Sequence, residues 1–385
     1  MTDSSIAPNV PGPVGGPRTE IGTEGGEVQQ VSGWGGSDQA IRPPSDTELL
    51  RVENLTVDFP TEDGIVHAVR GVSYSLRERE VLGIVGESGS GKSVSSMAVM
   101  GLLPKNARIN GRISFRGKDV LAMSQKEQRT LRGRKIAMIF QDPMTALNPV
   151  YTIGDQLAEA LRSHEPMPRK QALQRAEEML DLVGIPQPKQ RIKNYPHEFS
   201  GGMRQRAMIA MAVINNPDVI IADEPTTALD VTVQAQILEK LIEVKDAVNA
   251  AIILITHDLG VVAGMAHRVL VMYAGRPVEI GGVDDVYYRP RMPYTAGLLG
   301  SMPDLTGTGT RLRPIKGAPP SLINLPSGCP FNPRCPLATQ VCREVEPPLA
   351  ETDDRFHVAA CHHWERLAEE TDPTAFFRTE SEIVR

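Results

Sequence analysis

Three kinds of sequence feature are missing from this 385-residue chain, and each absence excludes a class of protein. No apolar run approaches the ~20 residues that a membrane-spanning helix needs. The first residues lack the charged and apolar parts of a secretory signal. The net charge of -6 includes no block of basic residues, which argues against a nucleic-acid partner. The sequence therefore predicts a soluble, cytoplasmic chain.

The chain divides into four predicted parts. Residues 1–47 are rich in glycine and proline and poor in bulky apolar residues, so we expect a disordered tail. Residues 48–285 alternate strand and helix patterns, which predicts an α/β core with a largely parallel sheet. Residues 286–365 are proline-rich and irregular, and contain all four cysteines. Residues 366–385 form a C-terminal tail.

A glycine-rich loop is the strongest motif of the chain. It follows an apolar run, 81–85, that predicts a buried strand, and it precedes a helix-compatible run, 95–103. Strand, glycine loop and helix are the context of a Walker A loop, in which the glycines let the backbone wrap around a polyphosphate. A chance glycine-rich turn is the alternative. The predicted phosphate-binding residues are Gly86, Glu87, Ser88, Gly89, Ser90, Gly91, Lys92 and Ser93, with Lys92 reaching the phosphates and the Ser93 hydroxyl ligating Mg²⁺.

Two acidic residues, Asp223 and Glu224, close another apolar strand. Ligands bind at this end of the strands in open α/β sheets. The aspartate can hold the Mg²⁺ shell, and the glutamate can orient or deprotonate an attacking water; an exposed acidic strand end is the alternative. His257 lies just beyond a further predicted strand, where a lone histidine is more often a satisfied polar residue than a catalytic one. Gln141 is equally ambiguous in isolation.

The order of the motifs resembles the ATP-binding cassette (ABC) family over residues 49 to about 285. A segment with Ser200, Gly201 and Gly202 at its centre precedes the acidic pair, and Asp230 follows it. The resemblance implies a P-loop NTPase fold with a mixed, largely parallel sheet, a helical signature subdomain and a small irregular C-terminal domain that contains the cysteines. It also implies ATP hydrolysis with ATP and Mg²⁺.

The same resemblance implies a role for each motif. Gln141 is the Q-loop glutamine, and His257 is the switch histidine that contacts the γ-phosphate. The signature loop caps the nucleotide of the opposite subunit, although Phe199 and Met203 depart from the common form at its ends. Phe59 occupies the place of an adenine-stacking aromatic, but could equally be a buried strand residue. Catalysis is assigned to Glu224, His257 and Gln141, nucleotide binding also to Phe59, Ser200, Gly201, Gly202 and Asp230, and Mg²⁺ binding to Ser93, Gln141 and Asp223.

A narrower resemblance covers more of the chain. The segments 140–149, 199–206 and 328–336 are similar to those of the oligopeptide/dipeptide importer ATPases. This implies an ATPase subunit peripheral to the cytoplasmic face of the membrane. Its expected partners are two permease subunits, a second and different ABC ATPase and, through the complex, an extracellular solute-binding protein. Import of nickel or another small solute is the alternative, followed by a soluble, non-transport ABC ATPase.

The four cysteines follow the spacing Cys-x5-Cys-x6-Cys-x18-Cys, which predicts one shared site. A cytoplasmic location disfavours disulfides. Four thiolates suit zinc or an iron–sulfur cluster, but zinc sites usually contain closely spaced pairs. The resemblance to peptide-importer ATPases, some of which hold a [4Fe–4S] cluster here, favours the cluster, with Zn²⁺ as the alternative. The predicted ligands are Cys329, Cys335, Cys342 and Cys361; His357, His362 and His363 are possible substitutes, although we expect them at the surface.

Overall fold

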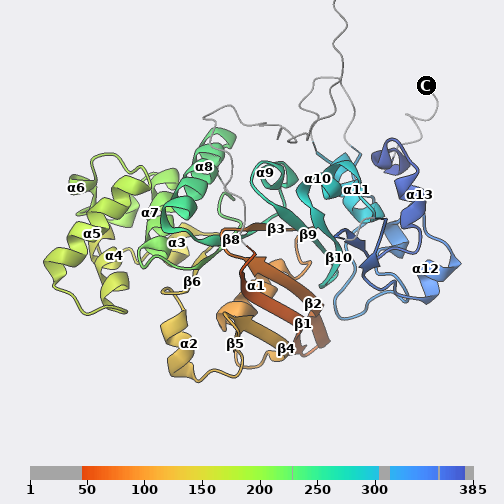
Figure 1. Ribbon diagram of the computed structural model, residues 1–385, viewed down its shortest axis with the longest axis horizontal. Helices are drawn as coiled ribbons and strands as arrows, with labels where there is room; N and C mark the ends of the chain where they lie inside the picture. The colour runs from red at the N-terminus through yellow and green to blue at the C-terminus, as the bar shows by residue number, and fades with distance from the viewer. Residues whose placement is uncertain (1–45, 228, 303–312, 354–355, 378–385) are drawn as a thin grey trace, which may run out of the picture. The chain divides into compact units, whose positions relative to one another are not determined.

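The structure is a computed structural model that describes residues 46–227, 229–302, 313–353 and 356–377 (Figure 1). The predicted N-terminal tail, apart from its last two residues, lies outside the described part. The residues that the structure describes all belong to one compact unit. The predicted division between residues 285 and 286 stays a prediction. The regions on either side of it share a sheet, as described below.

The large sheet has eight strands in the order β11-β12-β10-β9-β3-β8-β7-β6. Its central strands β3, β8 and β7 are parallel and buried throughout, which explains their uninterrupted apolar sequences. The strands span β3 Val81–Val85, β6 Ile136–Ile139, β7 Val219–Asp223, β8 Ala251–Thr256, β9 Arg268–Tyr273, β10 Arg276–Gly282, β11 Ala350–Glu351 and β12 Val358–Ala359.

A second, antiparallel sheet has the order β2-β1-β4-β5. Its strands span β1 Glu48–Thr61, β2 Gly64–Arg77, β4 Arg108–Phe115 and β5 Lys118–Asp119. Two large apolar cores lie on opposite faces of the large sheet, and alternate residues of β3 pack into one or the other. Leu82 and Ile84 pack with the second sheet and α1, whereas Val81 and Val85 pack with the helices on the opposite face. The large sheet is therefore covered on both faces, as parallel strands require.

The helices lie around the two sheets (Figure 1). The first helix begins at Lys92, three residues before the expected start, because the glycine loop leads directly into its first turn. The helices span α1 Lys92–Met100, α2 Gln125–Leu131, α3 Pro143–Ala146, α4 Ile153–Arg162, α5 Arg169–Leu182, α6 Pro188–Arg191, α7 Gly201–Val213, α8 Val231–Val248, α9 Leu259–Ala263, α10 Val283–Tyr288, α11 Pro293–Gly300, α12 Gln340–Glu344 and α13 Trp364–Ala368, with short 3₁₀ helices η1 Pro196–Glu198, η2 Asn332–Arg334 and η3 Pro373–Phe377.

The C-terminal region is joined to the cassette by backbone pairing. Strand β12 pairs with β10, so the hairpin β11–β12 extends the large sheet. Phe331 and Ala360 of this region lie in the same apolar core as the cassette helices. The predicted tail 366–385 begins inside α13, whose Leu367 is fully buried. Of the helices in the described ranges, none has the length and apolar character needed to cross a membrane.

Candidate functional site

The phosphate loop lies between β3 and α1 and depends on glycine at two positions. Gly86 has φ +149° and Gly91 has φ +97°, backbone conformations that other residues rarely adopt. A Cβ atom on Gly86 would lie 2.2 Å from the Met272 carbonyl oxygen, and one on Gly91 would lie 2.4 Å from the Ala68 carbonyl oxygen. The backbone at Met272 and Ala68 therefore packs directly against the loop.

Lys92 folds back over this loop. Its Nζ donates to the carbonyl oxygens of Gly86, at 2.7 Å, and Glu87, at 2.9 Å. Burial lowers the pKa of Lys92, and the carboxyl groups of Glu224 and Asp223 act in the opposite direction. An ammonium group held by two carbonyl oxygens can exchange them for phosphate oxygens, which is the chemistry expected of a Walker A lysine.

Ser93 and Asp223 meet at the carboxyl end of the sheet. The Ser93 hydroxyl donates to Asp223 Oδ1 at 2.8 Å. Burial raises the pKa of Asp223, and the bond from Ser93 opposes that shift. Two oxygen ligands are thus adjacent next to the phosphate loop, and this oxygen-only pair suits the preference of Mg²⁺.

Two other predicted residues, Gln141 and His257, converge on Glu224. Gln141 Nε2 donates to Glu224 Oε2 at 3.1 Å, and His257 Nδ1 lies 3.5 Å from Oε1. The backbone of Glu224 is left-handed, with φ 47°, and its N–H donates to the Ile255 carbonyl oxygen on β8 at 2.9 Å. Thr227, which sequence reasoning missed, also donates to Oε2, at 3.0 Å. The carboxyl group is therefore held in place from several elements.

The signature residues lie at the start of α7 and are accessible. The Ser200 side chain caps this helix by accepting from the Met203 N–H at 3.4 Å, and Ser200 and Gly201 are exposed while Gly202 is half-buried. Asp230 is likewise exposed and caps α8 by accepting from the Val233 N–H at 3.0 Å. The residues of both motifs thus lie at the N-termini of helices, and most of them are accessible from solvent.

Phe59 lies near the end of β1, opposite Val66 of β2. It is half-buried and packs against the core between the two sheets. One side of its ring is therefore used for packing, and its assignment to adenine stays a prediction.

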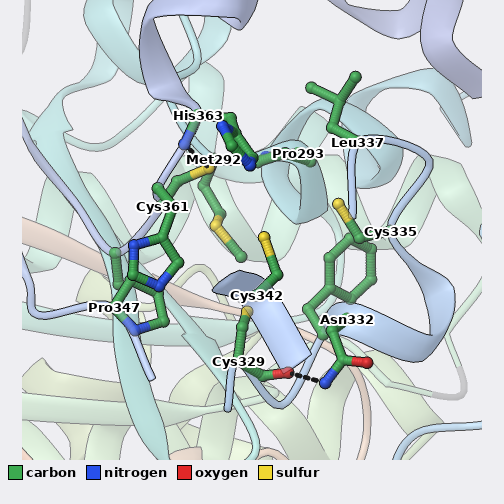
Figure 2. Close-up of a pocket in the computed structure, with 13 residues that line it drawn as sticks. Met292, Pro293, Cys329, Asn332, Cys335, Leu337, Cys342, Pro347, Cys361 and His363 are labelled. Carbon is green, nitrogen blue, oxygen red and sulfur yellow. Dashed lines mark hydrogen bonds between the residues drawn. The ribbon is translucent and has the colours of Figure 1, made fainter. Parts of the chain in front are cut away.

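The four cysteines line one small cavity in the C-terminal region (Figure 2). Cys329 and Cys335 flank η2, Cys342 lies in α12 and Cys361 follows β12. All four are free thiols. Burial raises the pKa of Cys329 to about 11 and the pKa values of Cys335 and Cys361 to about 12. Within the described ranges, no three or more His, Cys, Asp and Glu side chains are arranged as a ready metal-binding group.

The three nearby histidines have other partners. His357 is 1% exposed and its Nε2 pairs with Glu279 Oε1 at 2.7 Å, so the expectation that it lies at the surface is wrong. His362 Nε2 donates to the Val345 carbonyl oxygen at 2.9 Å, and His363 Nε2 pairs with the Thr339 hydroxyl at 2.7 Å. The cysteines are consequently the main candidate metal ligands among the side chains that line the cavity.

One long-range contact at the phosphate loop was not predictable from any motif. Arg334, from the C-terminal region, forms a two-bond ion pair with Glu87 of the loop, at 2.6 and 2.8 Å. These residues are 247 positions apart, and no sequence pattern connects them.

Comparison with known proteins adds two family matches and several close relatives. Residues 69–227 match the model described as ABC transporter, and residues 278–342 match that described as oligopeptide/dipeptide transporter, C-terminal region. The dipeptide transport ATP-binding protein DppD of Bacillus subtilis is 55% identical over 324 residues, covering 84% of this chain and 96% of DppD. The oligopeptide transport ATP-binding protein OppD of Escherichia coli is 54% identical over 303 residues, covering 79% and 90% of the two chains.

Solved structures share the cassette fold. The ATP-binding cassette MJ0796, in a dimer bound to ADP and Pi, is 26% identical with a TM-score of 0.55, covering 61% of this chain and 99% of that one. The structure of cbiO1 from Clostridium perfringens, part of the ABC transporter complex cbiONQ, is 28% identical with a TM-score of 0.55, covering 66% and 96%. The predicted fold class is confirmed. The chain therefore belongs to the ABC transporter family, as an ATP-hydrolysing cassette of the oligopeptide/dipeptide transporter group.

Proposed function

We propose that this chain is the ATP-binding subunit of an importer that takes up di- or oligopeptides across the cytoplasmic membrane. The ATPase assignment rests on one observation: Gln141 and His257 both contact Glu224, beside the phosphate loop. The peptide assignment is supported by the similarity to DppD and OppD, which extends through the C-terminal region.

The proposed roles follow from the positions of the side chains. Lys92 binds the β- and γ-phosphates, and Glu224 orients or deprotonates the attacking water while Gln141 and His257 hold that carboxyl group. Ser93, Asp223 and Gln141 would hold Mg²⁺, which would neutralise charge on the phosphates. The strained backbone at Glu224 is consistent with a functional position.

A partner cassette is expected to complete the site. The chain has one phosphate loop, and its Ser200 to Gly202 segment is accessible at the start of α7. We propose that this segment and Asp230 serve the nucleotide of a second ABC ATPase, a different chain in a heterodimer. Each ATP would then lie between the phosphate loop of one cassette and the signature segment of the other.

Four exposed apolar side chains in residues 140–151 mark the proposed permease contact. Phe140, Met144, Val150 and Tyr151 are 38%, 48%, 71% and 53% exposed, in the segment on either side of Gln141 and α3. Large apolar side chains grouped on a surface mark interaction sites. Docking of two permease subunits here would place the chain at the cytoplasmic face of the membrane, as a peripheral subunit of a complex that also engages an extracellular solute-binding protein.

Membrane fractionation tests this docking. We expect the chain to move to the soluble fraction in cells that lack the two permeases. The double substitution Val150→Ser and Tyr151→Ser should have the same effect when the permeases are present, whereas Glu239→Gln on the exposed side of α8 should not. Membrane retention without the permeases would contradict the docking proposal.

We also propose that Cys329, Cys335, Cys342 and Cys361 hold one metal centre, a [4Fe–4S] cluster in preference to Zn²⁺. The donor set supports this, since four thiols from separate segments line one apolar cavity (Figure 2). Buried thiols with raised pKa values are neutral without a cation, and a bound metal centre would deprotonate them and cross-link the segments. Iron, sulfide and zinc analysis after anaerobic purification tests the proposal. Stoichiometric zinc without sulfide would reject the cluster, and the absence of any metal would reject the site.

Reconstitution tests the transport function itself. The chain, its partner ATPase and both permeases would be assembled in proteoliposomes, with the solute-binding protein and a radiolabelled tripeptide library outside. We expect ATP-dependent peptide accumulation that is lost with Lys92→Ala. Uptake of Ni²⁺ but not of peptide, under the same conditions, would contradict the proposed substrate class.

A further inference from the structure

The phosphate loop contains a carboxyl group at a position where negative charge opposes its proposed ligand. Glu87 directly follows Gly86, and its own backbone is part of the loop. The Glu87 carbonyl oxygen accepts from Lys92 Nζ at 2.9 Å and from the Ser90 N–H at 3.2 Å, and its N–H donates to the Tyr294 hydroxyl at 2.8 Å. A free carboxylate here would repel a polyphosphate through like charge.

The carboxyl group is not free, because Arg334 covers it. Both guanidinium Nη atoms donate to the two Glu87 oxygens, at 2.6 and 2.8 Å. The Arg334 side chain is 5% exposed and that of Glu87 is 25% exposed. A two-bond arginine–carboxylate pair with one partner buried is both strong and geometrically specific.

The arginine itself is held by the C-terminal region and by Tyr273 at the end of β9. Its Nε donates to the Lys316 carbonyl oxygen at 3.1 Å, and its guanidinium carbon lies 5.9 Å from the ring centres of both Tyr273 and Phe331. The residue ends η2, the turn between Cys329 and Cys335. The position of the cation at the loop is therefore fixed by contacts with several residues.

We propose that Arg334 is a positioning residue that neutralises Glu87 and so lets the C-terminal region set the affinity of the phosphate loop for nucleotide. This inference rests on the proposed role of the loop in binding ATP. Without the arginine, the Glu87 carboxylate stands unpaired in the loop and weakens binding of the polyanion. Removing that carboxylate as well then restores binding.

Calorimetric titration of the full-length protein with MgATP tests the proposal. We expect Arg334→Gln to raise Kd roughly fivefold or more. Arg334→Lys, which keeps the charge, should bind more tightly than Arg334→Gln. The double variant Arg334→Gln with Glu87→Gln should return to within about twofold of the wild type. Glu87→Gln alone should bind MgATP more tightly than the wild type, because it leaves the Arg334 guanidinium without its carboxylate beside the loop.

The matched control is Arg291→Gln. Arg291 forms a similar two-bond pair with Asp353, at 2.9 and 2.7 Å, and its side chain is 7% exposed, but it does not contact the loop through this pair. It should leave Kd unchanged. Unchanged affinity in Arg334→Gln, or a double variant no tighter than Arg334→Gln, would overturn the proposal. If Arg334→Gln fails to fold, Glu87→Gln tests the same point. A Kd raised roughly fivefold in that variant would show that the carboxylate does not oppose binding, and would overturn the proposal.

A further variant separates this inference from the proposed function. If Lys92→Ala loses ATP binding while Arg334→Gln does not, only the role of Arg334 is wrong. If Lys92→Ala binds ATP as the wild type does, the proposed nucleotide site is wrong as well.

Discussion

The substitution Glu279→Gln should weaken the contact between the cassette and its C-terminal region. Glu279 lies in β10, is fully buried, and accepts three hydrogen bonds. Oε1 accepts from the Arg291 N–H and from His357 Nε2 at 2.7 Å, and Oε2 accepts from the Met292 N–H at 3.2 Å. Both oxygens of the carboxyl group therefore accept hydrogen bonds. In glutamine one oxygen is replaced by an NH₂ group, so at least one of the three buried donors would face the NH₂ group in place of an acceptor.

The expected loss follows from that single mismatch. A buried donor without an acceptor costs about 1–3 kcal/mol, so Glu279→Gln should lower the free energy of unfolding by about that amount. Glu279→Ala leaves all three donors without acceptors and also creates a cavity, and should cost about 3–5 kcal/mol. The C-terminal region should lose stability first, because all three donors belong to it or to the segment that leads into it.

Urea unfolding followed by the fluorescence of Trp364, which begins α13, reports on this region. Hydrogen exchange at the Met292 amide gives a second, local measurement. The control Glu239→Gln, exposed on α8, should change the free energy of unfolding by no more than about 0.5 kcal/mol. If Glu279→Gln were as stable as this control, with unchanged exchange at Met292, the hydrogen bonds to the Glu279 carboxyl group would not stabilise the C-terminal region as we expect.

Three further predictions concern the loop and the acid stability. Lys92→Ala should weaken ATP binding by at least roughly tenfold in a calorimetric titration, because it removes the cation expected on the phosphates; unchanged binding would contradict that role. Gly86→Ala should abolish ATP binding, since its Cβ would lie 2.2 Å from a backbone oxygen, and a variant that binds normally would refute the tight loop. The Arg291 guanidinium lowers the pKa of Asp353 to about 2, so this pair contributes stability above about pH 4 that is lost as the pH falls toward 2. Asp353→Asn should remove that part of the acid-unfolding curve, and an identical curve would contradict the pairing.

Much of the fold was predictable because its signals are local. Strand 81–85, the glycine loop and the helix that follows are contiguous, and β3 and α1 occur there, although α1 begins at Lys92. The buried parallel strands were recognisable from uninterrupted apolar runs. The order of the motifs predicted the ABC family, and the similarity to DppD and OppD confirms it.

The rest depends on contacts that sequence periodicity does not encode. Glu279 and His357 meet across the β10–β12 pairing, which unites regions that were predicted as separate. The Glu87–Arg334 pair joins the loop to an irregular segment that shows no periodic pattern. The four cysteines were expected to share one site, and they line one cavity, but the spacing does not identify what the cavity binds.

ATP turnover by the Glu224→Gln variant, in the assembled complex with both permeases and the partner ATPase, measures directly whether Glu224 activates the attacking water. We expect ATP binding to be retained and hydrolysis to fall roughly 100-fold or more, since the amide cannot accept a proton from the attacking water. A closed, ATP-bound complex should accumulate, and the Glu239→Gln control should turn over ATP as the wild type does. Near-normal hydrolysis by Glu224→Gln would contradict the catalytic role of Glu224.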